Sequence, residues 1–192
     1  RTRPSLPTRL RDPGDDRSWR EFFNRYWRLI HTTALRAGLT HAEAEEVVQE
    51  TIIAISRSIA EFDYKPEAGS FRGWLLNTTR WKIQDQFRRR AQRAGKPAQL
   101  LREGIRDPGA NELEAIWDRE WEANLIEQAL HRLKCRVPAL QYQIFDLYVL
   151  KEWPAERVAR VLGVQRGYVF VVKHRALRFL RRALAGLDKE MT

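Results

Sequence analysis

A stretch of interleaved cations and aromatic rings has the clearest chemical potential in this 192-residue sequence. Trp81 lies between Arg80 and Lys82, within a segment from Phe71 to Arg106 that holds ten Lys or Arg residues and only two acidic ones. Such cations track a phosphate backbone while flat rings stack on unpaired bases. The segment therefore predicts a surface for single-stranded nucleic acid, with Trp81 as its stacking or wedge residue.

A second basic segment runs from Gln165 to Leu187 and holds six cations and no acidic residue. It follows a short apolar-periodic stretch after Pro154 and a glycine turn at Gly163, which is the order of a helix-turn-helix. The second helix of this motif fits the major groove of duplex DNA, where Arg175 can pair bidentately with guanine. The expected inner residues are Val158, Ala159, Leu162, Val169, Val172 and Ala176. The expected outward residues are Phe170, Val171, His174 and Arg175, with Arg178, Arg181 and Arg182 near phosphates.

The elements that position these residues are all expected to be helices. Apolar residues recur at spacings of three and four, and no stretch shows sustained alternation with period two. Thr40 and Glu43 have the spacing of a capping box, and Ser70 is the expected N-cap of the basic-aromatic helix, in which Trp74 and Phe87 are expected core residues. Helices are predicted from about Trp19 to Ile30, Thr40 to Glu61, Ser70 to Arg90, Glu112 to Leu133 and Pro138 to Leu150, with one on each side of Gly163.

The chain is expected to form two helical domains joined by an irregular linker. Residues 91–111 lose the apolar periodicity and contain several Gly and Pro residues, which is typical of a linker. We therefore divide the chain into an N-terminal extension (1–17), a first domain (18–92), a linker (93–111), a second domain (112–187) and a tail (188–192).

Composition and charge exclude several classes of protein. The formal net charge of +10 favours a polyanionic partner, and 43% hydrophobic residues suffice for a core. Charges interrupt every apolar stretch, and the first residues lack the apolar core of a signal peptide, so a soluble, cytoplasmic protein without membrane insertion is expected. Cys135 is the sole cysteine, which excludes an internal disulfide and a cysteine-built zinc site.

An enzyme is not favoured, because the sequence offers no catalytic constellation. Asp85 is alone among cations, the four histidines are dispersed along the sequence, and no glycine-rich phosphate loop is present. We therefore expect neither catalytic residues nor a cofactor or metal.

Four segments, taken in order, resemble the extracytoplasmic-function sigma factors of the sigma-70 family. They are EAEEVVQET (43–51), GSFRGWL (69–75), DQFRRR (85–90) and the terminal helix-turn-helix, and the match runs from about Trp19 to Leu184. The resemblance implies a non-catalytic, two-domain subunit that directs bacterial RNA polymerase to promoters. The first domain would open and capture the minus-ten element, and the second would read the minus-thirty-five element as duplex.

The resemblance also implies which residues meet each partner. The acidic stretch would dock on the clamp helices of the beta-prime subunit through Glu43, Glu46, Gln49 and Glu50. The loop from Tyr64 to Ser70 would receive a flipped non-template base. The minus-ten contacts would be Tyr64, Lys65, Gly69, Ser70, Arg72, Arg80, Trp81, Lys82, Gln84, Arg88 and Arg89. The minus-thirty-five contacts would be Gln165, Arg166, Tyr168, Phe170, Val171, His174, Arg175 and Arg178.

Some residues depart from the family pattern. Trp81 stands where many relatives carry Asn, the run Phe170–Val172 replaces a more polar trio, and Lys173 occupies a position that is commonly an inward aliphatic. The base preferences at both promoter elements, and the rotation of the last helix, are therefore in question.

Further partners and one modification complete the expectations. The resemblance implies contact with the polymerase beta flap, a nucleoid-associated location and an anti-sigma protein that covers the polymerase-facing surfaces. Thr51, beside the acidic stretch, is a hypothetical phosphorylation site. The alternative function is a polymerase-independent helix-turn-helix regulator, which would need a dimer interface or an effector pocket and would bind its operator without polymerase.

Overall fold

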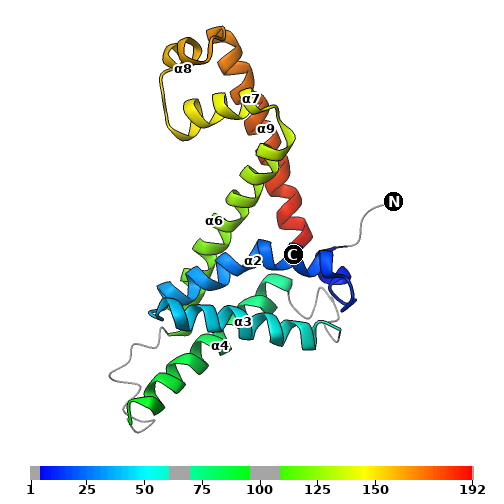
Figure 1. Cartoon of the computed structure of the whole chain (residues 1–192), viewed down its shortest axis with the longest axis vertical. Coiled ribbons are helices and arrows are strands. Elements are labelled where there is room, and N and C mark those ends of the chain that lie inside the picture. Colours follow the sequence, from blue (N-terminus) through cyan, green and yellow to red (C-terminus); the bar gives the residue numbers. More distant parts are fainter. Residues whose placement is uncertain (1–4, 61–69, 96–108, 192) are drawn as a thin grey trace. The chain divides into compact units, whose positions relative to one another are not determined.

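The computed structural model describes residues 5–60, 70–95 and 109–191, which form helices joined by turns, with no strand among them (Figure 1). The predicted all-α class is confirmed. The chain divides into two compact units. The second comprises Leu125–Lys189, and the first comprises Arg1–Asn124 together with Glu190–Thr192. This division falls inside a helix, beyond the predicted linker of residues 93–111.

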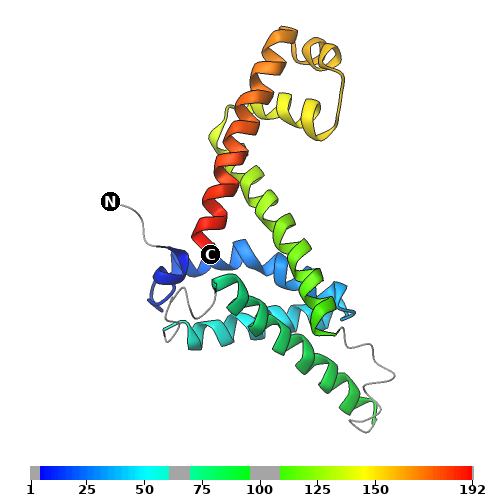
Figure 2. The ribbon, with the colours of Figure 1, turned by 180° about the vertical axis from the view of Figure 1, so that it is seen from behind.

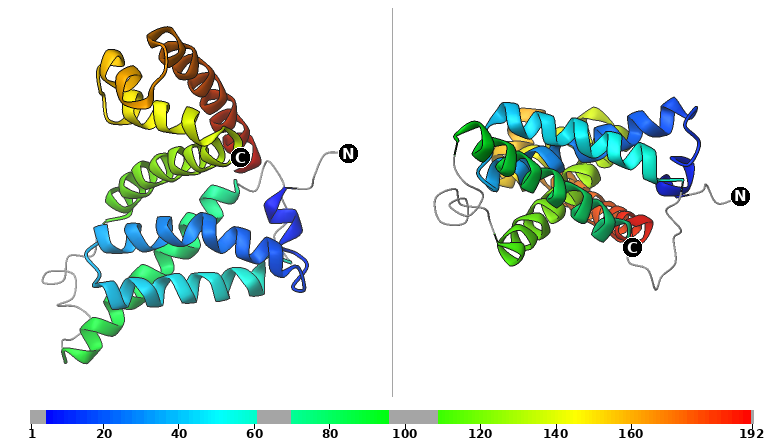
Figure 3. Two further views of the ribbon diagram at one scale, coloured as in Figure 1. Left: turned by 45° about the horizontal axis from the view of Figure 1, so that its top comes forward. Right: turned by 90° about the horizontal axis from the view of Figure 1, so that it is seen from below.

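The first unit is a helical bundle built around one apolar core. Its elements are α1 (Leu6–Arg9), α2 (Asp16–Arg36), α3 (His41–Ser58), α4 (Phe71–Arg93) and the first part of α6 (Ala110–Arg136). Helices α2 and α3 lie side by side and antiparallel (Figure 3), and α4 crosses α3 (Figure 2). The fully buried side chains of this core include Phe22, Tyr26, Ile30, Ile55, Phe71, Leu75, Ile83 and Trp117.

The starts of α3 and α4 follow the predicted caps. The Glu43 N–H donates to Thr40 Oγ1 at 3.3 Å, and the Thr40 N–H donates to Glu43 Oε2 at 2.8 Å, which completes the capping box. The Gly73 N–H donates to the Ser70 hydroxyl at 3.2 Å. Several helix bounds differ from the prediction. Helix α2 extends over Asp16–Arg36, α3 stops at Ser58, α4 continues to Arg93, and α6 covers Ala110–Arg136.

The N-terminal extension packs on the first unit, which the sequence did not indicate. Leu6 and Leu10 are buried, although they flank only one helical turn. The Arg9 guanidinium donates to the Ser18 hydroxyl at 2.8 Å and to Glu21 at 2.9 Å. Apolar burial and these bonds fix α1 against α2.

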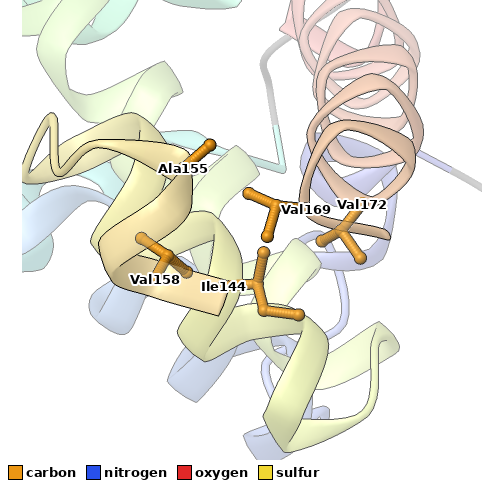
Figure 4. Close-up of a cluster of buried hydrophobic side chains, with 5 residues drawn as sticks. All are labelled: Ile144, Ala155, Val158, Val169 and Val172. Atoms are coloured by element: carbon orange, nitrogen blue, oxygen red, sulfur yellow. The ribbon is translucent and has the colours of Figure 1, made fainter. Parts of the chain in front are cut away.

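The second unit contains the predicted helix-turn-helix. Its elements are the rest of α6, α7 (Ala139–Phe145), a π-helical turn η1 (Asp146–Leu150), α8 (Ala155–Leu162) and α9 (Arg166–Met191). Gly163 ends α8 with φ = +64°, a left-handed conformation that glycine adopts without strain. Figure 4 shows the core that joins the two helices to α7, formed by Ile144, Ala155, Val158, Val169 and Val172.

Candidate nucleic-acid interface

The outer face of α4 presents one strongly exposed aromatic side chain. Trp81 is 68% exposed, although burying an indole is normally favourable. Its neighbours Arg80 and Lys82 are half-buried. Phe87 is buried, as predicted, whereas the predicted core residue Trp74 is only half-buried. The fold therefore leaves a flat, apolar ring in solvent beside cations.

Several α4 cations are already neutralised by the acidic residues of α3. Arg90 Nε donates to Glu43 Oε1 at 2.9 Å. The Arg89 guanidinium pairs with Glu50 at 2.5 Å, and Lys82 Nζ lies 3.8 Å from the other Glu50 oxygen. Residues that the sequence assigned to two different partners, polymerase and DNA, thus pair with each other along the α3–α4 contact.

A smaller part of α3 remains open to a partner. Glu46 is exposed, although its carboxylate accepts a bond from Gln86 at 2.8 Å and lies 3.9 Å from Arg89. Gln49 is exposed, and Ile53, one turn further along, is 48% exposed. The sequence analysis missed Ile53, whose position outside the apolar stripe of its helix was the available signal.

Glu43 has a structural role in the fold. The sequence predicted it both as part of the capping box and as a polymerase contact. The Arg90 guanidinium, followed by the Thr40 N–H and hydroxyl, lowers the pKa of Glu43 from an ordinary 4.5 to about 2. Its side chain is only 14% exposed. The carboxylate therefore stabilises the start of α3 and the α3–α4 contact.

The pH dependence of folding should report this role. A lowered carboxyl pKa stabilises the fold above pH 4.5, and the stabilisation is lost as the pH falls toward 2. We expect Glu43→Gln to lower the free energy of unfolding by about 1–3 kcal/mol at pH 7 and by much less near pH 2. Urea denaturation of the full chain at both pH values measures this difference. Glu45→Gln, at an exposed position one turn from His41, is the control, and an equal loss in both variants would contradict the assignment.

The remaining first-unit candidates occupy different environments. Arg88 and Gln84 lie on the outer half of α4, Arg88 exposed and paired with Asp85, and Ser70 caps the helix. Arg72 pairs with Asp118 of α6 at 2.5 Å. Tyr64, Lys65 and Gly69 lie outside the described residues.

The structure does not support phosphorylation of Thr51. Its side chain is fully buried in the α3 core, and the hydroxyl is enclosed by protein atoms. A kinase cannot reach this hydroxyl in the folded chain.

The second unit places most of the predicted duplex-reading residues on one exposed face of α9. The exposed members are Gln165, Arg166, Val171, His174, Arg175 and Arg178. Val171 is 42% exposed, and the Arg166 guanidinium pairs with Glu156 of α8 at 2.9 Å. The inner face consists of Val169, Val172 and Ala176, as predicted.

Two of the predicted minus-thirty-five contacts are half-buried and pack partly against the protein. Phe170 packs against the core cluster and makes an edge contact with the Tyr148 ring at 5.7 Å. The Tyr168 hydroxyl accepts a bond from Gln141 at 3.1 Å. The groove contact expected of Phe170 stays a prediction. The ring is half-buried, because Tyr148 of η1 offers it a packing partner that α9 alone could not reveal. The Nζ atom of Lys173 lies 5.5 Å from the centre of the same Tyr148 ring.

Within the described ranges, no three metal-binding side chains lie close enough together to hold an ion. None of the described helices is both long and apolar enough to span a bilayer.

Comparisons with known proteins agree with this architecture. The family model described as Sigma-70 region 2 matches residues 22–93, which cover α2 to α4. The chain is 29% identical over 157 residues to the ECF RNA polymerase sigma factor SigD of Mycobacterium tuberculosis, covering 82% of this chain and 69% of that protein. It is 28% identical over 184 residues to the ECF RNA polymerase sigma factor SigE of Mycolicibacterium smegmatis, covering 90% of this chain and 64% of that protein.

Two solved structures are also similar. The structure of the RsbN–BldN complex matches with a TM-score of 0.35 and 18% identity, covering 92% of this chain and 97% of that one. The structure of CnrH in complex with the cytosolic domain of CnrY matches with a TM-score of 0.38 and 19% identity, covering 94% and 96%.

The helical fold and the region 2 match define a sigma-70-type transcription factor. Within that class, the region 2 match and the similarity to SigD and SigE support an extracytoplasmic-function sigma factor that directs transcription.

Proposed function

We propose that this chain binds core RNA polymerase through α3, captures the melted minus-ten element on the outer face of α4, and reads the minus-thirty-five element as duplex with α9. The single observation that carries the proposal is Trp81, whose ring is 68% exposed beside Arg80 and Lys82. An exposed indole among cations suits a strand whose bases have left the duplex, because the ring can stack where a base pair has opened.

The minus-ten surface in this proposal is narrower than the basic segment of the sequence. Trp81, Arg80, Gln84 and Arg88 form its centre on the outer half of α4. Lys82, Arg89 and Arg72 can contribute only by exchanging a carboxylate partner for a phosphate. The proposal retains Tyr64, Lys65, Gly69 and Ser70 for the flipped base, since this loop leads directly into α4.

The polymerase-docking surface in this proposal centres on the exposed face of α3. Glu46, Gln49 and Ile53 offer a carboxylate, an amide and an apolar side chain at spacings of three and four residues. Glu50 lies at its edge, and Glu43 supports it from the helix start. The partner would be the clamp helices of the beta-prime subunit, with the beta flap meeting the second unit. An anti-sigma protein would cover these surfaces, and the protein would act at the bacterial nucleoid.

Run-off transcription with core polymerase on a library of genomic fragments tests the proposal. The expected result is promoter-dependent transcription and a stable complex between the chain and core polymerase. A chain that fails to associate with core polymerase, or that binds an operator tightly as a dimer without it, would refute the proposal.

The α9 surface gives a prediction about sequence reading. We expect Arg175→Ala to cost about 1–3 kcal/mol and to relax base preference at one position of the minus-thirty-five element. Arg178→Ala should weaken binding about equally on all sequences and reduce the dependence of affinity on salt concentration. Holoenzyme binding to promoter variants at two salt concentrations measures both effects. Equal loss of selectivity in both variants would contradict these separate roles.

A further inference from the structure

The proposed function assigns no role to the acidic segment at the start of α6. It contains Glu112, Glu114, Asp118, Glu120 and Glu122. The structure packs this part of α6 into the first unit through Leu113, Ile116, Trp117 and Trp121, which are buried, while the acidic residues other than Glu120 stay exposed. Exposed carboxylates, Asp118 among them, are thereby held in the same unit as α4, which carries the proposed minus-ten surface.

Arg72 of α4 pairs with one of these carboxylates, that of Asp118. Its guanidinium donates to Asp118 Oδ1 at 2.5 Å, and its Cζ lies 5.2 Å from the centre of the Trp121 ring. Trp121 is itself fixed, because it stacks on Tyr26 of α2 with ring centres 6.0 Å apart and planes 21° apart. The guanidinium therefore has an anionic oxygen at its edge and an aromatic ring against its face.

A nucleic-acid strand offers an arginine the same two features, a phosphate oxygen and the flat face of a base. A second ion pair, between Arg36 of α2 and Glu120, also ties α6 to the first unit. From this geometry we infer that, before DNA binds, Asp118 and Trp121 contact the Arg72 guanidinium as a phosphate and a base of the promoter strand would contact it afterwards. The inference rests on the proposed function, since it concerns the regulation of the same minus-ten surface.

The exposure of the pair decides how the exchange takes place. The Arg72 and Asp118 side chains are 37% and 56% exposed, whereas Trp117 and Trp121 are buried. A phosphate can therefore displace the Asp118 carboxylate while α6 stays packed. Asp118 acts as a competing anion that weakens strand binding, and Trp121 keeps the guanidinium positioned throughout.

Strand binding by the full chain, in its complex with core polymerase, tests this inference. The probe is a fluorescein-labelled, single-stranded non-template oligonucleotide from a promoter that supports run-off transcription. We expect Asp118→Asn to tighten binding about three- to fivefold at low salt, and this gain should shrink as salt rises. Arg72→Ala should weaken binding, and adding Asp118→Asn to Arg72→Ala should change nothing further, because the carboxylate then has no cation to withhold.

Glu122→Gln, which removes the same charge from an exposed position of the same helix, is the control. Equal tightening by Asp118→Asn and Glu122→Gln, or a gain that persists in the Arg72→Ala background, would overturn the inference. If Arg72→Ala weakens binding while Asp118→Asn has no effect, the inference fails and the proposed function stands. A wild-type complex that does not bind the strand contradicts both.

Discussion

Replacing Trp81 with alanine should slow the formation of the open promoter complex by about 10- to 100-fold, since stacking on one base is worth about 1–3 kcal/mol. The substitution removes a ring that is 68% exposed, so the thermal stability of the first unit should hardly change. Binding of the chain to core polymerase should also be unchanged, because the ring lies on α4 and not on the exposed face of α3. Permanganate footprinting of unpaired thymines over time measures the opening rate.

Trp81→Phe provides the graded comparison, because it keeps a smaller ring at the same place. We expect it to retain an intermediate opening rate, while Arg80→Ala lowers affinity in a salt-dependent manner without the same loss in opening. If Trp81→Ala opens promoters at the wild-type rate, the exposure of the Trp81 ring no longer supports the proposed function.

The substitution Trp117→Ala should have the largest effect on stability. Trp117 is fully buried in the first unit, and truncation of a buried aromatic side chain typically costs about 3–5 kcal/mol. Although its residue number lies in the predicted second domain, the structure assigns it to the first unit, where its ring lies against that of Trp121. Amide hydrogen exchange of the full chain should therefore show faster opening in α2, α3 and α4, with the amides of α7 to α9 unaffected.

Ile126→Ala is the matched control on the same helix, since Ile126 is 51% exposed and lies just past the division between the units. It should leave exchange in both units nearly unchanged. If exchange in Trp117→Ala became faster only in α7, α8 and α9, the assignment of the first part of α6 to the first unit would be wrong.

The helices and their caps could be predicted from the sequence because both depend on neighbours along the chain. The capping box at Thr40 needs only a residue three positions away, and the inner face of α9 follows from helical spacing. The boundary between the units could not be predicted in this way. The apolar side of α6 fits many helical cores, and only the fold shows that Trp121 stacks on Tyr26. The same limit explains Phe170, whose partner Tyr148 lies in another element.

The candidate site could be predicted in composition but not in its electrostatics. The sequence located the acidic and basic segments, yet Arg90 and Glu43 are 47 residues apart and nothing local indicates that they pair. The sequence also distinguished the two tryptophans of this helix only in part, since Trp81 is strongly exposed but Trp74, the predicted core residue, is only half-buried. Long-range pairing therefore decides which cations of α4 are available to a strand.

The location of Trp117 and Trp121 in the first unit has a consequence for a chain that has been cut. Gly95 follows the end of α4, and Gly109 precedes α6, so both flank elements of the same unit. A protease that severs the backbone once between these two glycines would produce two fragments held together by the tryptophan core. The nicked material would elute from a sizing column as one particle and separate only in denaturant.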